Sequence, residues 1–183
     1  RAAALWGADV CRFSVGGSTH ANQAFVLATT RPDREVVVPR TLHRSLLSGL
    51  VLTGAVPVWV RPDVDAATGM PLAVAPAAVS AALAARPGAT AVFLGDPSYV
   101  GTCGDVAAHA GIAHAAGVPL IVDAAWAAHF GFHPDLPPHA LAQGADGLVT
   151  SAHKTLPAYS QAALVLARTA RIDAARLDAG VEA

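Results

Sequence analysis

The chain has 183 residues, of which 54% are hydrophobic and 14% charged, and its formal net charge is −1. This composition can build a buried core, which excludes a disordered chain, and its Lys and Arg residues are scattered, which excludes a basic surface for nucleic acid or an anionic membrane. We therefore expect a globular protein whose partner is a small molecule.

Helical and strand patterns alternate along the chain. After a glycine-rich turn, apolar residues at helical spacing predict helices at 21–30, 41–54, 75–88 and 104–117. Short β-branched runs between and after them predict strands at 34–38, 56–60, 90–94, 118–122 and 146–150. Nearly continuous apolar strands that alternate with helices predict a mostly parallel sheet covered on both faces, a three-layer α/β/α fold.

Polar segments follow the predicted strands or precede the first predicted helix. They lie at 16–22, 40–45, 96–101, 123–130 and 151–154. Because the carboxyl ends of parallel strands meet at one edge of a sheet, and ligands of such sheets bind there, we expect these five segments to converge on one site.

The segment at Gly17, Ser18 and Thr19 suits a phosphate group. Glycines allow close approach of the backbone, the free N–H groups of a helix start attract an anion, and the two hydroxyls add donors. An ordinary helix cap after a glycine turn is the alternative interpretation.

Two charged residues stand at predicted strand ends. Asp123 could keep a heteroaromatic nitrogen protonated, or could simply cap the next turn. Lys154, if partly desolvated, has a lowered pKa and can form a Schiff base, whereas an ordinary surface lysine is the alternative. A phosphate anchor, a carboxylate and a lysine together are what pyridoxal 5′-phosphate requires.

Motifs in a fixed order support the same cofactor. They are GSTHAN at 17–22, R-x-x-H-x-S at 40–45, SGLVLTGAVPVWV at 48–60, P-S-Y-x-G at 97–101, VDAAWAAHFGFHPDLP at 122–137, and S-x-H-K at 151–154 with Ser160 and Gln161 downstream. Together they resemble the large domain of the Orn/Lys/Arg decarboxylase family, which are fold-type-I pyridoxal-phosphate enzymes. The resemblance implies that 1–183 is a large domain truncated at both ends, without the family's small C-terminal domain.

The resemblance also implies residue roles. Lys154 would hold the cofactor as a Schiff base, Asp123 would pair with its pyridinium nitrogen, and His43 would stack on its ring, although a histidine that merely starts a helix is the alternative at 43. The residues expected at or near the phosphate are Ser18, Ser151 and His153, with Thr19 and Gly17 close by. Those expected to line the ring pocket are Ala125 and Trp126.

The activity implied by the resemblance is decarboxylation of arginine, lysine or ornithine to the amine and carbon dioxide, within amino-acid metabolism and polyamine biosynthesis. The resemblance also implies a homodimer or higher homo-oligomer for the full-length protein. Three alternatives remain open: another fold-type-I reaction such as that of an aminotransferase or lyase, an inactive fragment, and a metal site built on His129, His133, Asp135 and His139. Gly131 and Pro134 argue against the helix that such a metal site needs, so we expect no metal.

Location follows from cysteine usage and hydropathy. Cys11 and Cys103 lack CxxC spacing and are too few for a disulfide framework, which favours a reducing compartment. The most apolar segment, at 49–60, is interrupted by Gly54 and Pro57, and the N-terminal residues lack the pattern of a signal peptide. We expect a cytoplasmic protein without membrane association.

Overall fold

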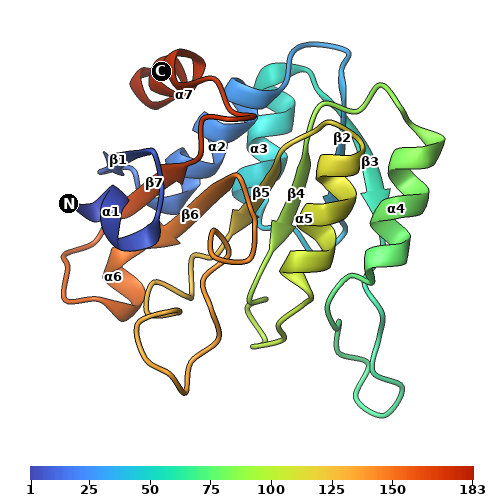
Figure 1. The fold of residues 1–183 in the computed structure, drawn as a ribbon. Coiled ribbons are helices and arrows are strands. Elements are labelled where there is room, and N and C mark those ends of the chain that lie inside the picture. Colours follow the sequence, from blue (N-terminus) through green and yellow to red (C-terminus); the bar gives the residue numbers. More distant parts are fainter.

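A seven-stranded sheet forms the centre of the computed structural model, which describes residues 1–183 (Figure 1). Its strand order is β1-β7-β6-β5-β4-β2-β3. The strands are β1 (Val10–Ser14), β2 (Glu35–Pro39), β3 (Val56–Val60), β4 (Val92–Gly95), β5 (Leu120–Asp123), β6 (Gly147–Ser151) and β7 (Ala163–Ala167). Strands β2 to β6 pair in parallel, whereas β7 is antiparallel to both of its neighbours. The five predicted strands are confirmed as β2 to β6, whereas β1 and β7 were not predicted.

Helices cover both faces of the sheet, which confirms the three-layer α/β/α prediction (Figure 1). The helices are α1 (Ala2–Trp6), α2 (Gly17–Thr29), α3 (Arg44–Thr53), α4 (Pro76–Ala85), α5 (Val106–Ala115), α6 (Ala152–Thr155) and α7 (Ala174–Glu182). Buried side chains of α2, α3 and α7 form one apolar cluster with one face of the sheet, and those of α1, α4 and α5 form a second cluster with the other face. None of these helices combines the length and the apolar character that a membrane crossing requires.

Side-chain alternation in β5 decides which way the predicted carboxylate faces. Leu120 and Val122 belong to the cluster under α4 and α5, whereas Ile121 belongs to the cluster under α2 and α3. Because successive strand residues point to opposite faces, Asp123 lies on the same face as Ile121. The carboxylate at the end of β5 is therefore directed toward α2 and α3.

Helix α2 begins earlier than the apolar pattern indicated. Its first residue is Gly17, so that Gly17, Ser18 and Thr19 form its first turn instead of preceding it. Gly17 has a φ of 68°, a conformation that favours glycine. The hydroxyls of Ser18 and Thr19 therefore stand at the open N–H groups of a 13-residue helix.

Candidate active site

A pocket of about 510 Å³ opens at the carboxyl ends of the parallel strands. All five polar segments predicted to converge contribute to it. The lining residues are Gly16, Gly17, Ser18, Thr19, Thr41, Leu42, His43, Arg44, Gly95, Pro97, Ser98, Tyr99, Asp123, Ala125, Trp126, Ser151, His153, Lys154, Ser160 and Gln161. Every residue expected at the cofactor site is among them, whereas the four residues of the metal alternative are not.

Asp123 closes the inner wall of this pocket. Its side chain is buried, Asn22 Nδ2 donates to its Oδ2 at 2.7 Å, and the Ala125 backbone N–H donates to its Oδ1 at 3.1 Å. Burial raises the pKa of the Asp123 carboxyl, and these two hydrogen bonds oppose that rise, as do the nearby positive charges of a protonated His43 and of Lys154. The bond from Ala125 is the turn cap considered as the alternative, so the carboxylate both caps the turn and faces the pocket.

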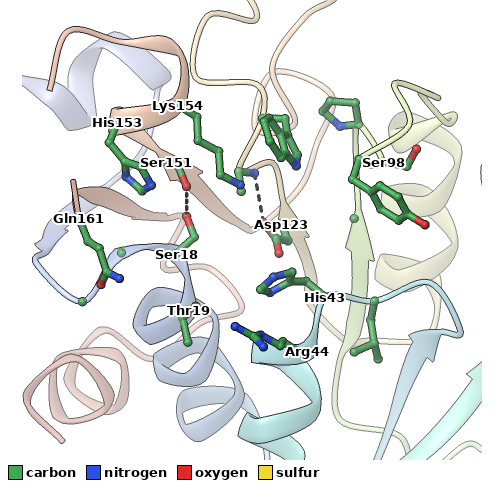
Figure 2. A pocket seen from close by; sticks show the side chains of 18 of the residues that line it. Ser18, Thr19, His43, Arg44, Ser98, Asp123, Ser151, His153, Lys154 and Gln161 are labelled. Carbon is green, nitrogen blue, oxygen red and sulfur yellow. Dashed lines mark hydrogen bonds between the residues drawn. The ribbon is translucent and has the colours of Figure 1, made fainter. Parts of the chain in front are cut away.

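Lys154 reaches the pocket from α6, the short helix that follows β6. Its Nζ lies 3.9 Å from the centre of the Trp126 ring, a distance at which the ring face attracts an ammonium. Partial desolvation lowers the pKa of Lys154, and the charge of Asp123 opposes the shift. In the view of Figure 2, Lys154 and His43 extend into the pocket from opposite sides, with Asp123 between them.

Hydroxyl and backbone donors gather at the other end of the pocket. Ser18 Oγ and Ser151 Oγ are 2.6 Å apart and join the start of α2 to the end of β6 (Figure 2). His153 Nδ1 lies 2.9 Å from the Ala162 carbonyl oxygen and 3.1 Å from the Ala162 backbone nitrogen, which leaves Nε2 for a ligand. A Cβ added at Gly17 would only touch Gln161 Cβ at 3.4 Å, so the positive φ of Gly17, and not lack of space, is what favours glycine there.

His43 is the N-cap residue of α3. Its Nδ1 accepts from the Ser45 backbone N–H at 3.2 Å and lies 2.8 Å from Ser45 Oγ. The alternative of a helix-start histidine is therefore also correct, and it does not conflict with a place in the pocket, because only Nδ1 is engaged in the cap.

These groups fit pyridoxal phosphate by their chemistry. Hydroxyls at a helix start suit the phosphate, a buried carboxylate suits a protonated ring nitrogen, and a lysine with a lowered pKa suits an aldehyde. All three lie in one pocket. The alternative of a metal site at His129, His133, Asp135 and His139 has no such arrangement. No group of three or more His, Cys, Asp or Glu side chains is placed to hold a metal ion.

Asn22 and Ser45 lie within the sequence motifs at 17–22 and 40–45, but no role was predicted for them, nor for Arg44 and Tyr99 of the pocket lining. Asn22 could have been noticed because it is an amide on the apolar face of α2, between the buried Ala21 and Phe25. Its partner across the helix interface could not, because that contact depends on how α2 packs against α3.

A comparison with known protein families decides where the chain belongs. The family described as "Orn/Lys/Arg decarboxylase, major domain" matches residues 1–181. The chain belongs to this family. Among curated proteins, an arginine decarboxylase of Halalkalibacterium halodurans is 33% identical to the chain over 176 residues. These residues are 96% of the chain and 36% of the relative. An arginine decarboxylase of Bacillus subtilis is 33% identical over 164 residues, 90% of the chain and 34% of the relative.

Solved structures agree with the family assignment. Lysine decarboxylase A from Pseudomonas aeruginosa superposes with a TM-score of 0.82 at 26% identity, over 99% of the chain and 27% of that structure. The constitutive lysine decarboxylase of E. coli, 20% identical with a TM-score of 0.81, shares the fold over 99% of the chain and 27% of its own length. The chain thus spans only about a third of the curated relatives it matches.

Proposed function

We propose that this chain supplies the cofactor-binding part of a pyridoxal-phosphate-dependent decarboxylase that acts on a basic amino acid. The observation that carries the proposal is the meeting of Lys154, Asp123 and the Ser18–Ser151 hydroxyl pair in one pocket. Membership of the decarboxylase family and the names of the arginine decarboxylase relatives support the reaction class and the basic substrate.

The residues of the chain divide the work by their chemistry. Lys154 would hold the cofactor aldehyde through Nζ, and its lowered pKa increases the share of uncharged amine. Asp123 would accept a hydrogen bond from the ring nitrogen and so favour its protonated form. Ser18, Thr19 and Ser151 would donate to the phosphate, with His153 beside them, and His43, Ala125 and Trp126 would bound the ring.

The cofactor, when bound, supplies an electron sink for the electrons released as the substrate carboxylate leaves as carbon dioxide. The chain orients the reacting bond and keeps the ring nitrogen protonated through Asp123. Asp123 is the only acidic residue that lines the pocket, and it is buried. Its proposed partner is the cofactor, so the lining offers no further carboxylate for a basic substrate side chain. We propose that groups recognising a basic substrate side chain come from outside this chain, either from the rest of the protein or from a second subunit of a homo-oligomer.

We also propose a cytoplasmic location and a contribution to polyamine synthesis. Both cysteines are unpaired, which suits a reducing compartment. The amine formed from arginine, lysine or ornithine is chemically a polyamine or a precursor of one.

Borohydride trapping tests the proposal at its central residue. The full-length protein that contains this chain is mixed with pyridoxal phosphate, reduced with borohydride, digested and mapped. We expect one reduced adduct, on Lys154, and its complete loss in Lys154→Ala and in Lys154→Arg, where the charge is kept but the aldehyde cannot be bonded. Adducts scattered over other amines in the unsubstituted protein would contradict the proposal.

Product analysis then tests the reaction class. Incubation with arginine, lysine or ornithine should release carbon dioxide and the corresponding amine, in at least one of the three cases. Formation of a keto acid without carbon dioxide would instead assign an aminotransferase reaction to the same pocket.

A further inference from the structure

A buried chain of hydrogen bonds connects Asp123 to His43 behind the pocket wall. Asn22 Nδ2 donates to Asp123 Oδ2 at 2.7 Å and to Ser45 Oγ at 2.9 Å, and Ser45 Oγ lies 2.8 Å from His43 Nδ1. Asn22 on α2 and Ser45 on α3 are each 1% exposed, and neither lines the pocket. Two residues that a bound ligand cannot touch therefore join two residues that it can.

The direction of each hydrogen bond follows from a count of donors. A carboxylate only accepts, so Asn22 must present its amide nitrogen to Asp123, and the two hydrogens of that nitrogen serve Asp123 and Ser45. Ser45 Oγ accepts from Asn22, so its own hydrogen is free for His43 Nδ1. The backbone N–H of Ser45 also donates to Nδ1, at 3.2 Å. Because this backbone N–H points at Nδ1, the neutral His43 ring accepts at Nδ1 and carries its proton on Nε2.

The other end of the Asn22 amide supports this arrangement. Asn22 Oδ1 is buried and has no hydrogen-bond partner. An unpaired buried carbonyl oxygen is unfavourable and rare in folded proteins. An amide with only a structural role would be more stable if both its oxygen and its nitrogen had hydrogen-bond partners. Here the nitrogen donates to Asp123 and Ser45, and these two bonds fix the orientation of the amide and leave its oxygen unpaired.

We propose that Asn22 and Ser45 are positioning residues of the site: Asn22 holds the Asp123 carboxylate in its ionised form and aims it at the pocket, and Ser45 keeps the proton of His43 on Nε2. The consequence for a bound cofactor rests on the proposed function, since Asp123 must accept from the ring nitrogen while His43 lies against the ring. The hydrogen-bond chain itself is independent of that function, and its two halves can be tested separately.

The histidine half is tested without cofactor. In the full-length protein labelled with ¹⁵N, the nitrogen shifts of His43, assigned by their absence in a His43→Asn variant, should show an unprotonated Nδ1 and a protonated Nε2. Ser45→Ala should increase the fraction with a protonated Nδ1 at a given pH. Thr53→Val removes another buried hydroxyl of α3, one that bonds only to backbone carbonyls of its own helix, and should leave the His43 shifts unchanged. A protonated Nδ1 in the unsubstituted protein, or equal effects of the two variants, would overturn the proposal.

The aspartate half is tested by the affinity for pyridoxal phosphate as a function of pH. Asn22→Leu removes a charge-assisted hydrogen bond to Asp123, so affinity near neutral pH should fall about ten- to a hundredfold. The loss of affinity with acidification should also begin at a higher pH, because the carboxylate is more easily protonated without its donor. Ser45→Ala keeps the Asn22–Asp123 bond, so the pH at which affinity begins to fall (the acid limb) should shift less than in Asn22→Leu.

The two halves also separate this inference from the proposed function. If the unsubstituted protein binds no pyridoxal phosphate, the proposed function fails, while the His43 shifts still decide whether Ser45 sets its proton. If the cofactor binds and Asn22→Leu changes neither its affinity nor the pH of the acid limb, the inference for Asn22 fails and the proposed function stands.

Discussion

Asp96 is a second desolvated carboxylate near the pocket, at the end of β4. Its Oδ2 accepts from the Gly104 backbone N–H at 2.5 Å, which closes the loop that carries Ser98 and Tyr99 of the pocket lining. Burial raises the pKa of Asp96 to about 6, and the bond from Gly104 opposes the rise. Between its ordinary value of 3.8 and about 6 the folded protein binds more protons than the unfolded chain, so Asp96 reduces stability as the pH rises through that window.

Replacement of Asp96 by asparagine should therefore stabilise the protein in a pH-dependent way. Asp96→Asn keeps an acceptor for Gly104 but has no charge to desolvate, so the free energy of unfolding should rise by about 1–3 kcal/mol at pH 8 and change little at pH 4. Urea unfolding at the two pH values measures this. Asp65→Asn is the control, because hydrogen bonds from Thr68 lower the pKa of this exposed aspartate, and its removal should give no gain at pH 8. Equal gains at pH 4 and pH 8 for Asp96→Asn would contradict the explanation.

At the scale of elements, α2 is held in place by close contact with α7. A Cβ added at Gly180 of α7 would lie 2.7 Å from the Ala24 carbonyl oxygen of α2, a backbone atom that cannot rotate away. The absence of a side chain at Gly180 therefore sets the distance between the two helices. Because Ser18 and Asn22 both belong to α2, this contact also affects the site.

Two glycine substitutions in helices should have opposite effects. Gly180→Ala should lower the free energy of unfolding by about 1–3 kcal/mol through steric overlap with α2. Gly111→Ala in α5, where an added Cβ meets nothing within 4 Å, should raise it by about 0.5–1 kcal/mol through helix propensity. Denaturant midpoints of the two variants check both signs, and stabilisation by Gly180→Ala would show that the helices can move apart without cost.

At the scale of the whole molecule, segments near the two ends of the chain meet at one edge of the sheet. Strand β7 is antiparallel to β1, and Arg12 of β1 pairs with Asp178 of α7, with 2.8 Å between Nε and Oδ1. Both side chains of this pair are more than a third exposed, whereas Leu177 beside it is fully buried in the cluster of α2 and α3. Burial of apolar surface, more than the ion pair, should hold the C-terminal helix in place.

The stability contributions of these two neighbours should differ clearly. Leu177→Ala should cost about 2–5 kcal/mol because it removes buried methyl groups and leaves a cavity. Asp178→Asn should cost less than about 1 kcal/mol, and less still at high salt, because the ion pair is exposed and screened. Thermal and urea unfolding at low and high salt measure both variants, and a larger loss for Asp178→Asn than for Leu177→Ala would reverse our ranking.

The sequence alone determined the parallel part of the sheet and the position of the main site residues. Apolar β-branched runs with Gly or Pro at their limits are a local signal, so β2 to β6 could be predicted, and parallel strands bring the residues that follow them to one edge. Asp123 and Lys154 were therefore predictable as neighbours in a pocket. The family motifs added His43, Ser151 and His153, whose positions in the pocket the structure describes.

Only the tertiary structure decided the rest. In strand β1 Phe13 is exposed and Ser14 is buried, so apolar residues do not mark its buried face. Its pairing partner β7 lies more than 140 residues away along the chain. The link from Asp123 through Asn22 and Ser45 to His43 likewise joins three segments that meet only when α2 and α3 pack on the same face of the sheet. Local patterns specify strands and helices because those depend on neighbouring residues, whereas contacts between distant segments depend on the packing of the whole domain.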